Sequence, residues 1–194
     1  MSRTIKISKR KREILNAAAI LFRYKGYSAT SMRDLAEKVG LEVSSLYSHI
    51  KSKEEILITL CFNCANLYSQ GLNQIMDMDT GAMEKLDAIM DLHINIAIDH
   101  PSSITVFNDE WKHLGVADLT EFLKVRKNYE KVVKSVLQNG IDEKVFKEYP
   151  LDILMNTVLS AMRWIHYSNS EYGKVERSTV QSTVKNIVMS GIKY

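Results

Sequence analysis

The chain has 194 residues, of which 45% are hydrophobic and 25% are charged, and it carries a net charge of +3. These values are typical of one or two globular domains with a substantial core. No run of about 18 apolar residues occurs, so no membrane-spanning helix is expected. The basic first residues are not followed by an apolar segment. We therefore expect no secretory signal and a cytoplasmic location.

Charge is distributed unevenly along the chain. Residues 1–53 carry 12 Lys and Arg against 4 Asp and Glu, whereas residues 54–194 carry 14 against 19. A basic first quarter on an acidic remainder is typical of a protein with a nucleic-acid-binding head. A solvated basic arm that binds nothing produces the same pattern, and charge alone favours that interpretation. Together with the motif in residues 31–57 described below, the charge favours nucleic-acid binding instead.

The apolar residues recur at steps of three and four rather than two, which predicts an all-α fold without strands. Helices are predicted at residues 9–24, 31–38, 45–50, 53–76, 83–99, 101–114, 117–140, 151–171 and 177–192. We expect residues 1–52 to form a DNA-binding domain and residues 53–194 to form a domain for ligand binding and dimerisation. The fourth helix is expected to serve both.

Residues 31–57 are the most informative stretch, because they predict a helix-turn-helix that continues into a long helix. Ser31 is a suitable N-cap, and Gly40 provides the left-handed residue that ends the first of the two helices. Ala36 is small where the helices must cross. The second helix is short, as in proteins that place a helix in the major groove. Its outward side offers hydrogen-bonding groups on Ser44, Ser45, Tyr47, Ser48 and His49.

This region resembles the tetracycline-repressor (TetR) family of bacterial transcription regulators. The resemblance covers residues 9–57, with the run SSLYSHIKSKEEIL as its most specific part. The matching residues are Leu15, Ala18, Leu21, Phe22, Gly26, Thr30, Leu35, Ala36, Gly40, Leu41, Leu46, Tyr47, His49, Lys53 and Leu57. Ile50 stands where the family often has Phe, an exchange of one apolar residue for another.

The resemblance implies a set of DNA contacts. Base edges are expected to be read by Arg33, Val43, Ser44 and Ser45, and phosphates to be held by Thr30, Ser31, Tyr47, His49 and Lys53. The chemistry agrees, because hydroxyl, imidazole and ammonium groups donate to phosphate, and an arginine pairs with guanine through two hydrogen bonds. A core position for Tyr47 and an ordinary surface position for His49 are the competing interpretations.

The second half concentrates aromatic residues and methionines, which either form a core or line a cavity for an apolar ligand. The segments FNDEWKHL and EFLKVRKNYEKVVKSVLQNGIDEKVF resemble the acyl-CoA-responsive branch of the family, in which basic residues near the cavity mouth hold the CoA phosphates. Lys127 is a further candidate for that role. The expected ligand-binding residues are Phe107, Trp111, Arg126, Tyr129, Met162, Arg163 and Trp164. A lipophilic drug is the alternative effector.

Two other motifs favour no chemistry of their own. Cys61 and Cys64 lie in mid-helix without further cysteines, so packed reduced thiols are expected rather than a redox or zinc site. Glu110 and His113 form one Glu-x-x-His, whereas carboxylate-bridged metal bundles need two. A metal-using helical enzyme built on this pair, and a carrier that has lost DNA binding, are the rival classes.

The expectation is a ligand-responsive transcriptional repressor that binds a palindromic operator as a homodimer and has no catalytic residue, cofactor or metal. Dimerisation is expected to use the last two helices. Their apolar residues are Leu151 to Ile165 on one and Val180, Val184, Ile187 and Val188 on the other. Two such helices from each subunit can close a four-helix bundle.

Overall fold

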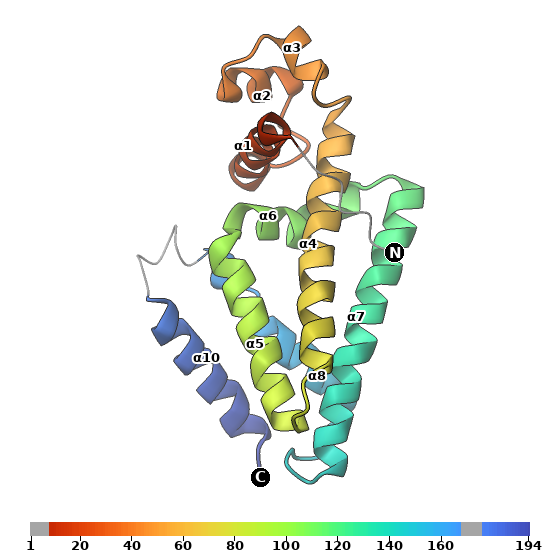
Figure 1. Ribbon diagram of the computed structural model, residues 1–194, viewed down its shortest axis with the longest axis vertical. Helices are drawn as coiled ribbons and strands as arrows, with labels where there is room; N and C mark the ends of the chain where they lie inside the picture. The colour runs from red at the N-terminus through yellow and green to blue at the C-terminus, as the bar shows by residue number, and fades with distance from the viewer. Residues whose placement is uncertain (1–7, 168–175) are drawn as a thin grey trace. The chain divides into compact units, whose positions relative to one another are not determined.

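The structure is a computed structural model that describes residues 8–167 and 176–194 (Figure 1). Its longer helices are α1 (Lys9–Lys25), α2 (Met32–Val39), α4 (Lys53–Met76), α5 (Ala82–Asp99), α7 (Val116–Asp142), α8 (Leu151–Ser160) and α10 (Arg177–Ile192). Two short helices are α3 (Val43–Tyr47) and α6 (Pro101–Thr105). Within the described residues there is no strand, and only Phe146 and Lys193 form an isolated bridge. The all-α prediction is confirmed.

Three predicted helices differ from the structure. The helix predicted at 101–114 is α6 followed by a π-helical turn, η1 (Val106–Glu110), and a 3₁₀ turn, η2 (Trp111–His113). Helix α3 ends at Tyr47, because the Ser48 hydroxyl donates to the Ser45 carbonyl and competes with further helix. Helix α8 ends at Ser160, and residues 168–171 of its predicted range lie outside the described residues.

The chain forms two compact units. Unit 1 comprises Met1–Cys64 and Ser102–Thr120, and unit 2 comprises Ala65–Pro101 and Glu121–Tyr194. The division falls inside α4, so this helix contributes residues to both units. Apolar spacing reports which face of a helix is buried, but it does not report that residues 102–120 pack with the first helices.

Unit 1 is built around the packing of α1 against α2 and of α2 against α3. The buried residues follow the predicted stripes: Ile14, Leu15, Ala18, Ala19, Phe22, Leu35, Ala36, Leu46 and Ile50. Gly40 ends α2 with φ +64° and ψ +42°, the left-handed conformation that glycine adopts without strain. The backbone amide of Leu41 donates to the Ala36 carbonyl at 2.9 Å. This hydrogen bond gives a partner to one of the carbonyl groups that the end of α2 leaves unpaired.

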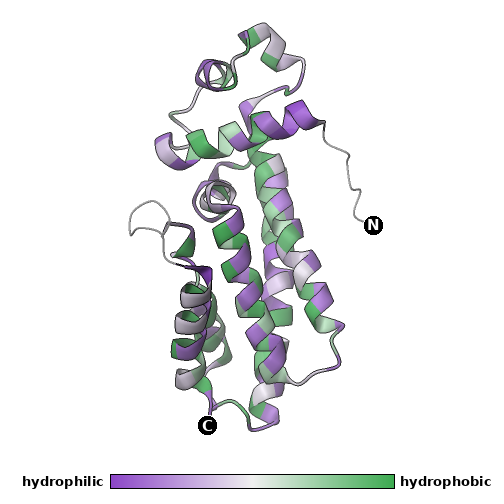
Figure 2. Cartoon of the chain, turned by 60° about the vertical axis from the view of Figure 1, so that its left-hand side comes forward, coloured by the Kyte–Doolittle hydropathy of each residue, from purple (hydrophilic) through white to green (hydrophobic). Residues whose placement is uncertain are grey.

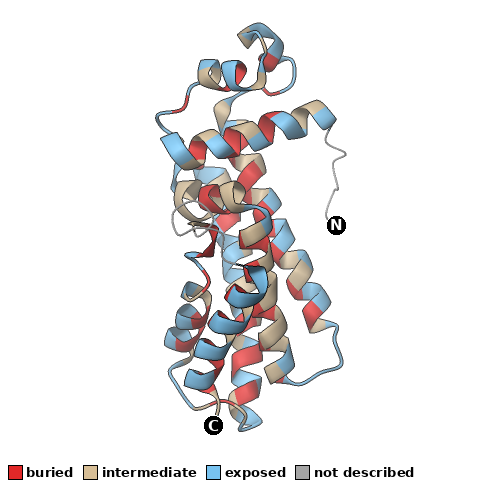
Figure 3. Cartoon of the chain, turned by 90° about the vertical axis from the view of Figure 1, so that its left-hand side faces the viewer, coloured by how far each residue is buried: buried red, intermediate tan, exposed pale blue. Residues whose placement is uncertain are grey.

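Unit 2 is a helical bundle with an apolar core. Leu86, Met90, Val133, Phe146 and Val158 are among its fully buried residues. Apolar residues recur along α5 and α10, separated by polar ones (Figure 2), and buried positions repeat along the same helices (Figure 3). Burial of these faces from water is the main contribution that holds the bundle together.

Polar contacts fix α10 along α5. Lys185 lies 2.7 Å from Asp87 and 2.8 Å from Asp91, each distance joining the ammonium nitrogen to a carboxylate oxygen. Towards the other end, Arg177 pairs with Asp99. These contacts repeat at intervals of four residues or multiples of four, which keeps them on one face of each helix.

Candidate nucleic-acid interface

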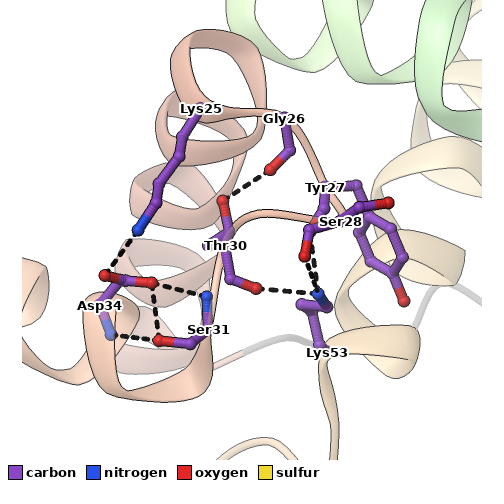
Figure 4. A network of polar contacts seen from close by, with 8 residues as sticks. All are labelled: Lys25, Gly26, Tyr27, Ser28, Thr30, Ser31, Asp34 and Lys53. Carbon is purple, nitrogen blue, oxygen red and sulfur yellow. Dashed lines mark hydrogen bonds and ion pairs between the residues drawn. The ribbon is translucent and has the colours of Figure 1, made fainter.

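Helix α2 begins with a capping box that holds the start of the helix-turn-helix (Figure 4). The Ser31 hydroxyl accepts from the Asp34 amide at 3.1 Å, while the Asp34 carboxylate accepts from the Ser31 amide at 2.7 Å. Lys25 lies 2.8 Å from the same carboxylate. The Lys25 ammonium, and then the Ser31 hydrogen bonds, hold the pKa of Asp34 far below its usual range. The α1–α2 turn and the first turn of α2 therefore form one fixed piece.

Helix α3 is the candidate reading helix. Leu46 is fully buried and, with Ile50, anchors the helix to unit 1. Tyr47 has 49% of its surface exposed, which excludes the core interpretation. The other expected contact residues share this outward placement: Ser31, Arg33, Ser44, Ser45 and His49 are exposed and Val43 is half-buried. The helix thus presents a surface of hydroxyl, phenol and imidazole groups.

Lys53, at the start of α4, turns back into unit 1 (Figure 4). Its ammonium donates to the Tyr27 and Thr30 carbonyl oxygens, both at 2.8 Å, and lies 3.4 Å from the Ser28 carbonyl oxygen. An ammonium has three donors, and these three carbonyls occupy them. The same ammonium lies 4.4 Å from the centroid of the Tyr27 ring. In this conformation Lys53 holds the α1–α2 turn.

Thr30 is also directed into the turn. The residue is 2% exposed, and its hydroxyl donates to the Gly26 carbonyl at 2.8 Å. The residues expected to contact phosphate therefore divide into an exposed set, Ser31, Tyr47 and His49, and an internal pair, Thr30 and Lys53. The sequence pattern places all five near the interface but does not show the direction of a side chain.

The Glu-x-x-His pair also supports this turn. Glu110 accepts from the Tyr27 amide at 3.3 Å through one carboxylate oxygen, and its other oxygen lies 3.3 Å from His113 Nε2. The His113 ring stacks on the Tyr27 ring with centroids 5.3 Å apart. Neither Tyr27 nor this role of Glu110 and His113 is evident from the sequence, because 83 residues separate the hydrogen-bonded Tyr27 and Glu110.

The residues expected to bind a ligand are divided between the two units. Phe107 and Trp111 are half-buried in unit 1. In unit 2, Met162 is buried and Tyr129 packs against the core, whereas Arg126, Arg163 and Trp164 are exposed. Arg126 pairs with Glu130 at 3.0 Å. Unit 2 thus brings together Tyr129 and Met162 in its interior and leaves both arginines at its surface.

A second polar residue lies beside Tyr129. His93 Nε2 and the Tyr129 hydroxyl are 2.8 Å apart. Burial lowers the pKa of His93 to about 4 and raises the pKa of Tyr129. The sequence held a signal for His93, since it falls at helical spacing among the apolar residues Met90, Ile94 and Ala97 of α5.

Neither cysteine is accessible for chemistry. Cys61 and Cys64 are buried and reduced, and burial raises the pKa of each thiol to about 12. A thiol with such a pKa is not a thiolate at neutral pH and is a poor nucleophile or metal ligand. In the parts of the chain that the structure describes, no group of three His, Cys, Asp or Glu side chains is placed to hold a metal ion. Across the same residues, no helix has the length and apolar character needed to cross a membrane.

Comparisons with known proteins agree with this geometry. Residues 14–60 match the family described as bacterial regulatory proteins, tetR family, and residues 79–192 match the tetracyclin repressor-like C-terminal domain. The transcriptional repressor KstR2 of Mycolicibacterium smegmatis is 29% identical over 162 residues, which cover 80% of this chain and 78% of that protein.

Solved structures share the fold. The ketosteroid transcriptional regulator KstR2 of Mycobacterium tuberculosis superposes with a TM-score of 0.91 over 97% of both chains at 24% identity. AibR, in complex with isovaleryl coenzyme A and operator DNA, has a TM-score of 0.81 at 20% identity over 92% of this chain and 97% of AibR.

The two matched regions together span most of the chain, from residue 14 in α1 to residue 192 at the end of α10. The family consists of transcription regulators, which removes the support for a metal-using enzyme. The chain therefore belongs to the TetR family of bacterial transcription regulators, with a helix-turn-helix at its N-terminal end and a helical regulatory domain after it.

Proposed function

We propose that this protein is a ligand-responsive transcriptional repressor that binds a palindromic operator as a homodimer in the bacterial cytoplasm. The observation that carries the proposal is the exposed polar face of α3, held on a buried anchor in a basic unit. Two such heads related by a two-fold axis fit an inverted repeat, because operator symmetry mirrors protein symmetry.

The exposure of the side chains supports different roles for different residues of the helix-turn-helix region. Arg33, Val43, Ser44 and Ser45 are proposed to contact base edges. Ser31, Tyr47 and His49 are proposed to contact phosphates, since their side chains are exposed. Thr30 and Lys53 are proposed to position these residues by fixing the α1–α2 turn, since their polar groups bind backbone carbonyls.

Dimerisation is proposed to use the outward faces of α8 and α10. The residues Val180, Val184 and Val188 are buried within their own subunit, so they are not available to a partner. Ile187 instead is 69% exposed, and Ile153 on α8 is 65% exposed. Ile153 borders a shallow hollow lined also by Asp152, Asn156, Thr157 and Ser160. Such a surface of one large and several small side chains allows close helix packing in a four-helix arrangement.

The effector is proposed to be a hydrophobic small molecule, with an acyl-CoA or a fatty acid favoured. The apolar interior of unit 2 suits an apolar tail, and the exposed Arg126 and Arg163 suit an anionic head. AibR forms a complex with isovaleryl coenzyme A, which supports the acyl-CoA class. KstR2 is described as a ketosteroid regulator, which supports a second apolar class. A lipophilic drug is the alternative.

Release requires that the effector bind the DNA-free form more tightly than the DNA-bound form. The test is a titration of a labelled operator complex with long-chain acyl-CoAs, free fatty acids, a ketosteroid and lipophilic cations. We expect an acyl-CoA to release the operator at micromolar concentration. Release by the cations alone contradicts the acyl-CoA proposal and indicates control of drug efflux.

A further inference from the structure

The His93–Tyr129 pair is a polar feature inside an apolar bundle. His93 on α5 and Tyr129 on α7 are joined by their 2.8 Å contact, and the Tyr68 ring of α4 lies 4.6 Å from the His93 ring and 5.9 Å from the Tyr129 ring. All three belong to unit 2. Three helices therefore converge on one imidazole and one phenol.

The surroundings of the pair offer few polar partners. Tyr129 packs against the hydrophobic core of unit 2, and the neighbours of His93 on α5 include the buried Met90, Ile94 and Ala97. In the described part of the chain, the contact between them is the only hydrogen bond that either side chain makes. Two polar side chains in an apolar core cost stability relative to hydrophobic ones, which favours a role in binding over a role in folding.

The pair has one hydrogen-bond donor available for a ligand. The low pKa of His93 keeps the imidazole neutral at physiological pH, and the raised pKa of Tyr129 keeps the phenol protonated. The two side chains then hold one N–H and one O–H donor between them, and their mutual contact uses one. Whichever tautomer is present, one donor is left for a further partner. The pair carries no charge with which to compensate a carboxylate.

Neither residue of the pair is fully buried. Both His93 and Tyr129 keep part of their surface exposed, although the pair packs among core residues. An uncharged donor beside an apolar core recognises an uncharged acceptor on an apolar molecule. A free carboxylate placed there would lose its hydration without gaining a counter-charge.

We propose that His93 and Tyr129 form the polar end of the effector site and recognise an uncharged carbonyl oxygen on an apolar molecule. This inference rests on the proposed ligand-responsive function and deepens it. A keto group or a thioester carbonyl satisfies the requirement, whereas a free fatty acid does not. The pair therefore discriminates among the effector classes that the apolar interior alone accepts.

The test measures ligand affinity by calorimetry on the full-length protein without DNA. The probes are decanoyl-CoA and S-decyl-CoA, a thioether that lacks the carbonyl, together with androst-4-ene-3,17-dione, its hydrocarbon androstane, and decanoate. For at least one pair, we expect the carbonyl compound to bind about tenfold more tightly than the partner that lacks the carbonyl, the effect of one hydrogen bond. We expect decanoate to bind more weakly than that carbonyl compound.

The variants are Tyr129→Phe and His93→Phe, which keep a ring at each position. Each is expected to reduce the carbonyl preference to about threefold or less while affinity for the partner that lacks the carbonyl is retained. Tyr149→Phe, the same change at a residue that is 43% exposed, is the control and should keep the full preference.

Three results overturn the inference: a carbonyl preference that persists in both variants, its absence in the wild-type protein for both pairs, or decanoate binding as tightly as the carbonyl compound. Operator binding by the wild-type protein is measured separately. If the wild-type protein binds no operator, the proposed regulatory function is contradicted, whatever the calorimetry shows.

Discussion

Lys53 and Tyr27 are joined twice: the Lys53 ammonium donates a 2.8 Å hydrogen bond to the Tyr27 carbonyl oxygen and lies 4.4 Å from the centroid of the Tyr27 ring. Because Tyr27 also contacts Glu110 and His113, the start of α4, the α1–α2 turn and the η1–η2 segment meet at one residue. The α1–α2 turn, which leads into the helix-turn-helix, is thus held from two sides.

Lys53→Met is expected to loosen the α1–α2 turn without changing the number of phosphates contacted. Loss of the donors leaves partly buried carbonyls unpaired, at a cost of about 1–3 kcal/mol in local stability. Amide hydrogen exchange should therefore speed up in the turn, and operator affinity should fall while its dependence on salt is kept. The exposed Lys51, changed to Met, is the control for loss of charge. A smaller salt slope with unaltered exchange in Lys53→Met indicates instead a direct phosphate contact.

Arg33→Ala and Tyr47→Phe are expected to separate base reading from phosphate binding. Arg33 is exposed in the first turn of α2 and has the geometry to pair with guanine. Its loss should relax preference at one base pair by about 1–3 kcal/mol. Tyr47→Phe should weaken binding to all sequences alike. Affinities for a set of single-base operator variants measure both effects, and a uniform loss for Arg33→Ala removes its assigned role.

Protonation of His93 is expected to make unit 2 less stable in mild acid. The folded pKa of about 4 lies below the ordinary value of 6.5, so the unfolded chain binds the proton first. The free energy of unfolding should fall as the pH drops from about 6.5 to about 4, by at most about 3 to 4 kcal/mol at 1.4 kcal/mol per pKa unit. Denaturant titrations across this range should show the loss in wild type and in the exposed control His100→Gln. The His93→Phe variant should not show this loss of stability. If His93→Phe loses as much stability as the wild type, protonation of His93 is not the cause.

Lysine substitutions on the outward faces of α8 and α10 are expected to yield folded monomers. Ile153 and Ile187 are exposed in the subunit, so their replacement leaves its core intact while it places charges in the proposed interface. Sedimentation velocity on Ile153→Lys/Ile187→Lys measures the result. Val116→Lys/Leu123→Lys, at exposed residues of α7, is the control and should stay dimeric. If Ile153→Lys/Ile187→Lys stays fully dimeric, the interface lies elsewhere on the protein.

The sequence predicts the fold well where one helix face is apolar. The ranges of α1, α2, α4, α5 and α10 agree with prediction to within one residue, because caps and apolar spacing act locally. The π-helical turn at Val106–Glu110 was not predicted, since its wider winding leaves no separate mark in apolar spacing.

The candidate site was predicted as a list of residues but not as an arrangement. Exposure of Arg33 and Tyr47 agrees with the expected interface, whereas Thr30 and Lys53 point inward. Contacts such as Glu110 to Tyr27 and His93 to Tyr129 join segments far apart in the chain. Such pairings depend on how helices pack, and one sequence read by local spacing does not contain them.

Selection of binding sites from random duplex DNA by the purified wild-type protein is the sharpest test of operator reading by α3. We expect enrichment of an inverted repeat with half-sites about one helical turn, or a multiple of it, apart. Binding to that repeat should weaken steeply with salt, with a log–log slope of about −5 or steeper if six or more phosphates are neutralised. Enrichment of no inverted repeat, or binding that does not depend on sequence, contradicts the assignment of α3 as the operator-reading helix.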